Sequence, residues 1–323
     1  MFVTFEEASE MIAEGGLLHI AGTEALLKKL PRGNWAGGST EYFMTDDGGK
    51  VSGDMLFINE LPFKEFSIKS YCADTIKNVA EDAFEHGFSI AIVPFDCAVH
   101  KVYAEKAPGF ESIFIKNIVG WISGVNLGKP GQTPIAVNGM TGETHTDKAA
   151  VLHIGVPEDR NVTIGVIDVF EQDEASPIIE FTEEGFAAKN CLINGVEKNF
   201  AEYITESRID TKLPLVGSYS GCGVNVSFKS VENGVVSFFA PVFSGIKYRV
   251  AKSVPDYELE FNSRLADRMS DLNSHVMFSC NCVLNFLHGE LEGKSTDSFV
   301  GPITFGEIAC QLVNQTLVYV MVQ

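Results

Sequence analysis

Positive charge is scarce in this chain. Lys and Arg together number 24 against 43 Asp and Glu, and the formal net charge at pH 7 is −19. A surface with that charge repels the phosphates of nucleic acids and anionic lipid headgroups. We therefore expect neither a nucleic acid nor a membrane as a partner. A small-molecule ligand stays open, even an anionic one, because a few backbone N–H groups can bind an anion locally.

The chain also lacks an uncharged apolar run long enough to cross a bilayer. Its first residues, Met-Phe-Val-Thr-Phe-Glu-Glu, carry neither the basic nor the apolar segment of a secretion signal. Its 7 cysteines are odd in number and widely spread, which does not match a disulfide framework. These absences predict a cytoplasmic protein.

The common catalytic and metal-binding motifs are missing. We find no Gly-x-Ser-x-Gly elbow, no phosphate-binding P-loop and no Gly-x-Gly-x-x-Gly fingerprint. Cys280 and Cys282 share one face of a predicted strand, but without a second matched pair they predict buried thiols and not a metal site. We expect a non-catalytic protein. The enzyme alternative is a cysteine-dependent hydrolase with Cys222 as the nucleophile.

Apolar residues are abundant, and their pattern predicts the fold. They make up 45% of the 323 residues, and 24 are Phe, enough for the cores of two ordinary domains. Short apolar strands alternate with turns and a few amphipathic helices. We predict an α/β protein of the α+β type, with mixed, largely antiparallel sheets and flanking helices. The linker-like segment 171–176 suggests domains at residues 1–175 and 176–323.

The two halves share one local pattern. Residues 30–60 and 213–243 each contain a Leu-Pro pair, a Gly-rich strand, a tight turn and a returning apolar strand. Turns of this kind connect β-hairpins. We therefore predict an internal repeat in which both segments are hairpins with the same connection.

The last third of the chain resembles FIST proteins, a bacterial family of intracellular sensory modules. The resemblance rests on Phe278-Ser-Cys280, then Gly301-Pro-Ile-Thr-Phe-Gly-Glu-Ile308, then the strand Leu312-Val-Asn-Gln-Thr-Leu-Val318, in that order. In the first half, Gly37-Gly-Ser-Thr40 is similar to a strand of the N-terminal FIST domain. The Arg that FIST sequences place after the Phe-Ser-Cys strand is missing here. The resemblance implies a divergent, stand-alone sensory protein. Its implied partner is a signalling protein or a second copy of the chain in a homodimer.

These patterns together predict a ligand site at the seam between the halves. Glycines in a strand allow close approach of a ligand, and a carboxylate between apolar strands is costly unless it is paired or faces a polar pocket. The candidate ligand-binding residues are Trp35, Gly38, Ser39, Thr40, Tyr219, Cys222, Phe305 and Glu307.

Two further readings of the sequence remain open. Some FIST-type proteins bind haem and sense nitric oxide, and His19, which lies in an apolar strand, is the candidate axial ligand. A structural or assembly protein without a ligand is the other. A Soret band in the purified protein selects haem, and a bound organic molecule selects the sensor.

Overall fold

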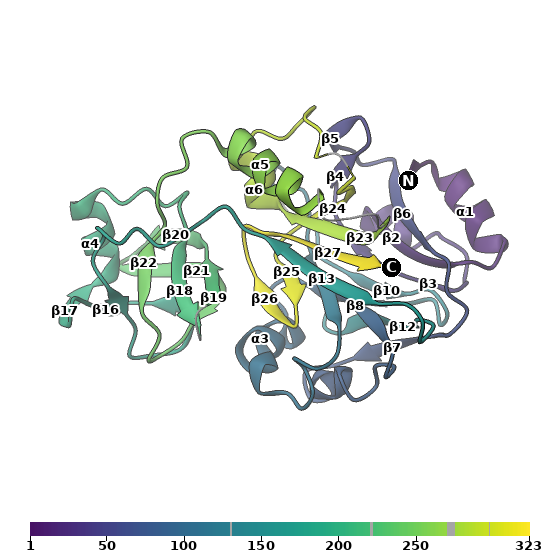
Figure 1. Ribbon diagram of the computed structural model, residues 1–323, viewed down its shortest axis with the longest axis horizontal. Coiled ribbons are helices and arrows are strands. Elements are labelled where there is room, and N and C mark those ends of the chain that lie inside the picture. The colour runs from purple at the N-terminus through teal and green to yellow at the C-terminus, as the bar shows by residue number, and fades with distance from the viewer. Residues whose placement is uncertain (130, 220–221, 270–274, 297) are drawn as a thin grey trace. The chain divides into compact units, whose positions relative to one another are not determined.

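The computed structural model describes residues 1–129, 131–219, 222–269, 275–296 and 298–323. It is an α+β fold with mostly antiparallel sheets, as the sequence predicts. Two compact units divide it. Unit 1 comprises residues 1–167, 265–312 and 316–323, and unit 2 comprises residues 168–264 and 313–315. This division differs from domains 1–175 and 176–323, because the C-terminal strands return to the first unit, as the yellow end of the chain in Figure 1 shows.

The first sheet of unit 1 carries the Gly-rich strand. Its strand order is β1 (Phe2–Val3), β6 (Leu56–Leu61), β2 (Leu17–Gly22), β3 (Trp35–Ser39), β10 (Ala136–Asn138) and β11 (Glu143–His145). Strands β2 and β3 are parallel, with Ile20 opposite Gly37. Side chains of this sheet and of the first helix, among them Trp35 and Ile20, form one apolar core.

Two further sheets lie in unit 1, apart from Val313 of β26, which belongs to unit 2. One has the order β26 (Gln311–Val313), β25 (Glu307–Ala309), β9 (Ile118–Ser123), β8 (Gly87–Pro94), β12 (Ala149–Gly155) and β7 (Phe66–Tyr71). The other has the order β13 (Val162–Ile167), β27 (Leu317–Val322), β23 (His275–Cys282), β24 (Gly301–Thr304), β4 (Tyr42–Thr45) and β5 (Gly48–Val51). Strand β8 is buried at every position, as its continuous apolar run predicts for a central strand.

Unit 2 is built on its own sheets and core. One sheet has the order β17 (Val196–Asn199), β16 (Asn190–Ile193), β14 (Ile179–Glu180), β22 (Tyr248–Val250), β18 (Leu215–Tyr219) and β19 (Cys222–Val226). The other has the order β15 (Gly185–Ala188), β21 (Val235–Val242) and β20 (Phe228–Glu232). Phe181, Phe200, Phe238 and Tyr248 lie in their shared apolar core.

The helices are short, and the first begins at a capping box. Thr4 accepts from the backbone N–H of Glu7, whose carboxylate accepts from the Thr4 backbone, so the capping box is present. The described helices are α1 (Phe5–Ala13), α2 (Glu24–Leu27), α3 (Ala98–Lys106), α4 (Phe200–Ser207), α5 (Tyr257–Met269) and α6 (Val283–His288), with 3₁₀ turns η1 (Ile76–Val79) and η2 (Ala107–Gly109). Among the described residues, none of these helices has the length and apolarity that a bilayer crossing requires.

The predicted repeat is wrong in its strand pairing. The stretch 35–44 is not one strand, because β3 and β4 belong to different sheets. Strand β3 pairs with β2 and β10, whereas its proposed counterpart β18 pairs with β19 and β22. Turn chemistry made both segments look alike, but long-range pairing decided their partners. The apolar spacing of Ile76, Val79, Ala80 and Ala83 after Asp74 also predicts a helix, but the structure forms only the 3₁₀ turn η1 there.

Candidate functional site

Ser39, the last residue of β3, binds both ends of a long loop. Its N–H donates to Ile135 O over 3.0 Å, and its carbonyl accepts from Gly124 N over 2.8 Å. Its hydroxyl donates to Gly124 O over 2.8 Å and accepts from Ile135 N over 2.9 Å. Residues 124–135, which connect β9 to β10, are called the 124–135 loop below. Ser39 therefore closes the base of this loop, and its hydroxyl is fully used.

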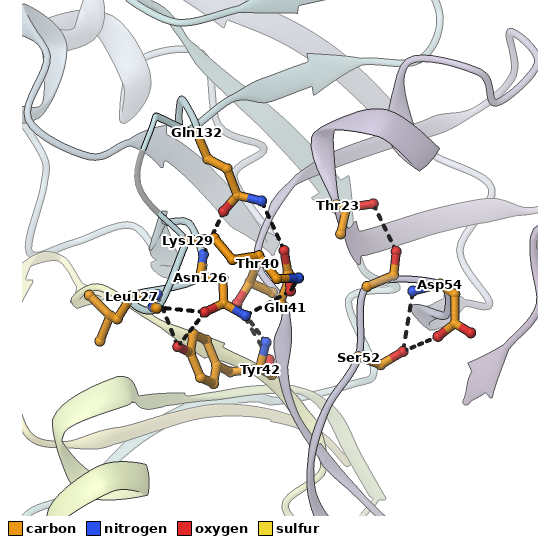
Figure 2. A network of polar contacts seen from close by, with 12 residues as sticks. Thr23, Thr40, Glu41, Tyr42, Ser52, Asp54, Asn126, Leu127, Lys129 and Gln132 are labelled. Atoms are coloured by element: carbon orange, nitrogen blue, oxygen red, sulfur yellow. Dashed lines mark hydrogen bonds and ion pairs between the residues drawn. The ribbon is translucent and has the colours of Figure 1, made fainter.

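Two residues further on, Glu41 holds the interior of the same loop. Figure 2 shows the side chains of Asn126, Lys129 and Gln132 converging on the Glu41 carboxylate. Oε2 accepts from Asn126 Nδ2 over 2.8 Å and from Lys129 Nζ over 2.6 Å, and Oε1 accepts from Gln132 Nε2 over 3.0 Å. Glu41 itself is 4% exposed. One buried carboxylate thus organises three polar side chains of a surface loop.

The charge state of Glu41 follows from these contacts. Burial by itself raises the pKa of a carboxyl group, because it disfavours the charged form. Here the hydrogen bonds from Lys129, Gln132 and Asn126 oppose burial, and the pKa of Glu41 lies below its ordinary value. Glu41 is therefore a carboxylate at neutral pH. A buried charge of this kind requires its partners to stay in place.

A small cavity lies beside this cluster. Its volume is about 20 Å³, enough for one water-sized group. Its walls are Thr23, Glu24, Ser39, Thr40, Glu41, Gly124, Val125 and Gln132. Of the residues predicted from the sequence, Ser39 and Thr40 line it. The Thr40 hydroxyl donates to Ile303 O over 2.8 Å, so it also supports the backbone.

His19 is built into the core with both ring nitrogens in use. The indole Nε1–H of Trp121 donates to His19 Nε2 over 2.8 Å, so Nε2 carries the lone pair. Nδ1 then carries the proton and lies 3.1 Å from Asn59 Oδ1. Burial lowers the pKa of His19 to about 4. The Nε2 lone pair is engaged by Trp121 and Nδ1 is protonated, so neither nitrogen is available to iron in this arrangement, and the structure removes the reason to assign haem to His19.

Glu307 is enclosed and is satisfied internally. Its side chain has no exposed surface. Oε2 accepts from the N–H and hydroxyl of Thr316, over 3.3 and 2.9 Å, and Oε1 lies 2.8 Å from the Thr304 hydroxyl. Burial raises the pKa of Glu307 to about 8 despite these hydrogen bonds. The Thr304 hydroxyl also lies 3.2 Å from the carbonyls of Asn281 and Gly306, so it can accept a hydrogen bond from neutral Glu307 and donate its own to one of these carbonyls.

A protein family of unknown function, DUF6976, matches residues 3–323, which is nearly the whole chain. The chain belongs to this family. No curated protein matches it. For this DUF6976 chain, the functional evidence is therefore the geometry of its own residues.

The other predicted site residues of this DUF6976 chain are distributed over both units. The Trp35 indole N–H donates to Pro31 O over 2.9 Å, and its ring belongs to the unit 1 core instead of forming a wall for a ligand. Phe305 packs where Gly124 leaves room, because a Cβ on Gly124 would lie 1.9 Å from its ring. Tyr219 and Cys222 are opposed in unit 2, and their side chains lie outside the described residues. The proposed roles of Tyr219 and Cys222 stay predictions.

A buried polar chain in unit 1 was missed by sequence reasoning. Tyr71 Oη lies 2.7 Å from both Asp82 Oδ2 and His153 Nε2, and His153 Nδ1 lies 2.8 Å from Ser89 Oγ. Burial lowers the pKa of His153 to about 4. Ser89 and His153 have no exposed surface, so the chain links strands β7, β8 and β12 instead of serving a substrate. Within the described residues, no group of three His, Cys, Asp or Glu is placed to hold a metal ion.

Glu41 and the 124–135 loop were also missed as site residues. Glu41 directly follows Gly38-Ser39-Thr40, and Asn126, Lys129 and Gln132 recur every third residue in a Gly-rich and Pro-rich loop. A spacing of three residues within a loop predicts no shared face, because a loop lacks the regular repeat of a strand or a helix. Only the closure of the loop over β3 brings the three side chains to one carboxylate.

Proposed function

We propose that this protein is a non-catalytic sensory protein that binds a small molecule beneath the 124–135 loop. The observation that carries the proposal is the Glu41 carboxylate, which lies beside a cavity and holds three side chains of one surface loop. Functional loops are often placed on a rigid scaffold in this way. Strand β3 and its neighbours supply the scaffold here.

The contacts of Glu41 suit a sensor because each hydrogen bond to its carboxylate can be replaced by a hydrogen bond from a ligand. The loop makes polar contacts to Glu41, and the exposed Leu127 indicates that its tip is not anchored by an apolar side chain at that position. A ligand that binds Glu41 beside Asn126 and Gln132 favours the held state of the loop over the released state. Such a shift requires only that the ligand prefers one of the two states.

We extend this proposal to a FIST-type sensory role in the cytoplasm, with a signalling protein or a second copy of the chain as the partner. The ordered C-terminal motifs support the sensory role. The net charge of −19 disfavours nucleic acid and membrane as partners. The ligand then changes the 124–135 loop, and the partner detects that change. The previously proposed seam between halves has no part in this site, which lies in unit 1 alone.

The proposal is tested by following the loop directly. Hydrogen–deuterium exchange of peptides covering residues 124–135 is measured with and without each member of a panel of small metabolites, together with the thermal shift. A ligand of this site slows exchange in the loop and raises Tm. Glu41→Gln removes both effects, whereas Glu60→Gln, which changes an exposed carboxylate on β6, keeps them. A ligand that raises Tm equally in both variants and leaves the loop unchanged overturns the proposal.

A further inference from the structure

The cavity beside Glu41 has a size and lining that define its occupant. Its volume of about 20 Å³ accepts one group of the size of water. Glu24 and Glu41 are among its walls, and no basic residue is among the described walls, although the Glu24 carboxylate is paired outside the cavity with the Lys28 ammonium over 2.5 Å. Thr23, Thr40 and Gln132 are also among its walls. This lining favours a small positive group that donates hydrogen bonds.

Lys129 already supplies such a group to Glu41 from the loop. Its ammonium lies 2.6 Å from Glu41 Oε2. The Lys129 side chain is 56% exposed, whereas the Glu41 side chain is 5% exposed. An ammonium on a long exposed stem can turn into water at little cost, because water solvates it well. The buried carboxylate cannot follow, and it then requires another cation.

We infer that this site binds a primary ammonium group of a small organic molecule, which replaces the Lys129 ammonium at Glu41. The inference rests on the proposed function and names its ligand class. The exchange conserves charge at the carboxylate, since one ammonium leaves as the other enters. Asn126 and Gln132 keep their hydrogen bonds to Glu41, and only Lys129 is released to the surface.

Other ligand chemistries fit this geometry less well. An anionic ligand would be repelled by the carboxylate of Glu41 and would approach that of Glu24 as well. A hard metal ion such as Ca²⁺ takes six to eight oxygen ligands. At Glu41, the side chains of Asn126 and Gln132 present N–H groups, and the Ser39 hydroxyl oxygen already accepts from the Ile135 N–H. A quaternary ammonium has the charge but no N–H to donate, so it cannot replace the hydrogen bond of Lys129.

The probe that tests this inference is methylammonium chloride, titrated into the whole protein by isothermal calorimetry at constant ionic strength. Tetramethylammonium, K⁺ and Ca²⁺ are titrated in parallel. We expect methylammonium to bind and the other three not to bind. Lys129→Ala removes the internal competitor and is expected to tighten methylammonium binding about tenfold or more, because a tethered group acts at an effective concentration in the millimolar range. Lys50→Ala, which removes a surface lysine paired with Asp47, leaves the affinity unchanged.

Two outcomes overturn the ammonium assignment. One is a Lys129→Ala protein that binds methylammonium no more tightly than the parent. The other is binding of tetramethylammonium, K⁺ or Ca²⁺ at least as tight as that of methylammonium. If a different compound slows exchange in the 124–135 loop while amines do not, the proposed function stands and the ligand class is wrong. If no compound changes the loop, the proposed function fails as well.

Discussion

The ammonium of Lys129 lies 2.6 Å from the carboxylate of Glu41, and the lysine is exposed where the glutamate is buried. An ion pair between two exposed side chains contributes little to stability. In this pair the buried partner depends on the exposed one, because an uncompensated carboxylate in a protein interior is costly. The relationship makes the loop sensitive to anything that competes for either group.

The first prediction concerns the hold of Glu41 on its loop. Glu41→Gln removes the charge that Lys129, Asn126 and Gln132 share, and we expect the free energy of unfolding to fall by about 1–3 kcal/mol. Exchange in the 124–135 loop should become faster by a larger factor than in β8. Asp47→Asn, in an exposed ion pair with Lys50, is the control and should change neither quantity. Loop exchange as slow as in the parent would show that Glu41 does not hold the loop.

The second prediction concerns the base of the loop. Ser39→Ala leaves Gly124 O and Ile135 N without the hydroxyl, and both are enclosed at β3. We expect a loss of about 1–3 kcal/mol, typical of buried groups left without a partner. Ser9→Ala removes a hydroxyl that bonds to Phe5 O within helix α1, and it is expected to cost less. Urea denaturation of both variants makes the comparison, and equal losses would contradict a special role for Ser39.

The third prediction concerns close packing at Gly38. A Cβ there would lie 2.5 Å from Ile92 Cγ2 and 3.0 Å from Trp121 Cη2. Gly38→Ala should therefore overpack the space between β3 and the strands β8 and β9, and lower stability by about 1–3 kcal/mol. Gly109→Ala is the matched control, because a Cβ at Gly109 meets nothing within 4 Å. Equal melting temperatures for the two variants would place the space at Gly38 outside the packed core.

The fourth prediction concerns acid sensitivity at His19. Its folded pKa is lowered to about 4, below the ordinary value of 6.5, so the unfolded chain binds more protons between those values. Stability contributed by neutral His19 is complete above pH 6.5 and is lost as the pH falls toward 4. His19→Gln can accept from Trp121 and donate to Asn59 without titrating. Urea unfolding at several pH values should show a shallower acid loss in this variant, by up to about 1.4 kcal/mol per pH unit. Parallel curves for parent and variant would mean that the pKa of His19 is the same in the folded and the unfolded chain.

The fifth prediction concerns Glu307, whose contribution to stability changes with pH in the opposite direction to that of His19. Its folded pKa is raised to about 8 from 4.5, so the folded chain holds the extra proton between those values. The contribution of Glu307 to stability is therefore highest below pH 4.5 and declines as the pH rises toward 8. Glu307→Gln imitates the neutral acid, with an N–H for Thr304 and an oxygen for Thr316. We expect the variant to match the parent near pH 5 and to exceed it in Tm near pH 8. A variant that is less stable at both pH values would show that Glu307 is ionised in the fold.

The local features of the fold could be predicted from the sequence because their causes are local. The capping box of Thr4 and Glu7 predicts the start of α1, and the continuous apolar run 88–94 predicts a buried strand, which the structure extends to Gly87–Pro94. The acidic composition and the absence of common catalytic motifs directed attention to small-molecule binding. Ser39 and Thr40 were chosen because of the glycines before them, and they do lie beside a cavity.

The sequence by itself determined local elements such as helix α1 and the buried strand β8, because periodicity, caps and turn residues act within a few positions. Only the tertiary structure decided that β3 pairs with β2 instead of folding back as a hairpin. Only the tertiary structure placed Trp121 against His19, across 102 positions of the chain, and the 124–135 loop over Glu41. These contacts depend on which distant surfaces become buried together, and the pKa of a buried group depends on those partners. The functional site of this protein is therefore a property of its long-range packing.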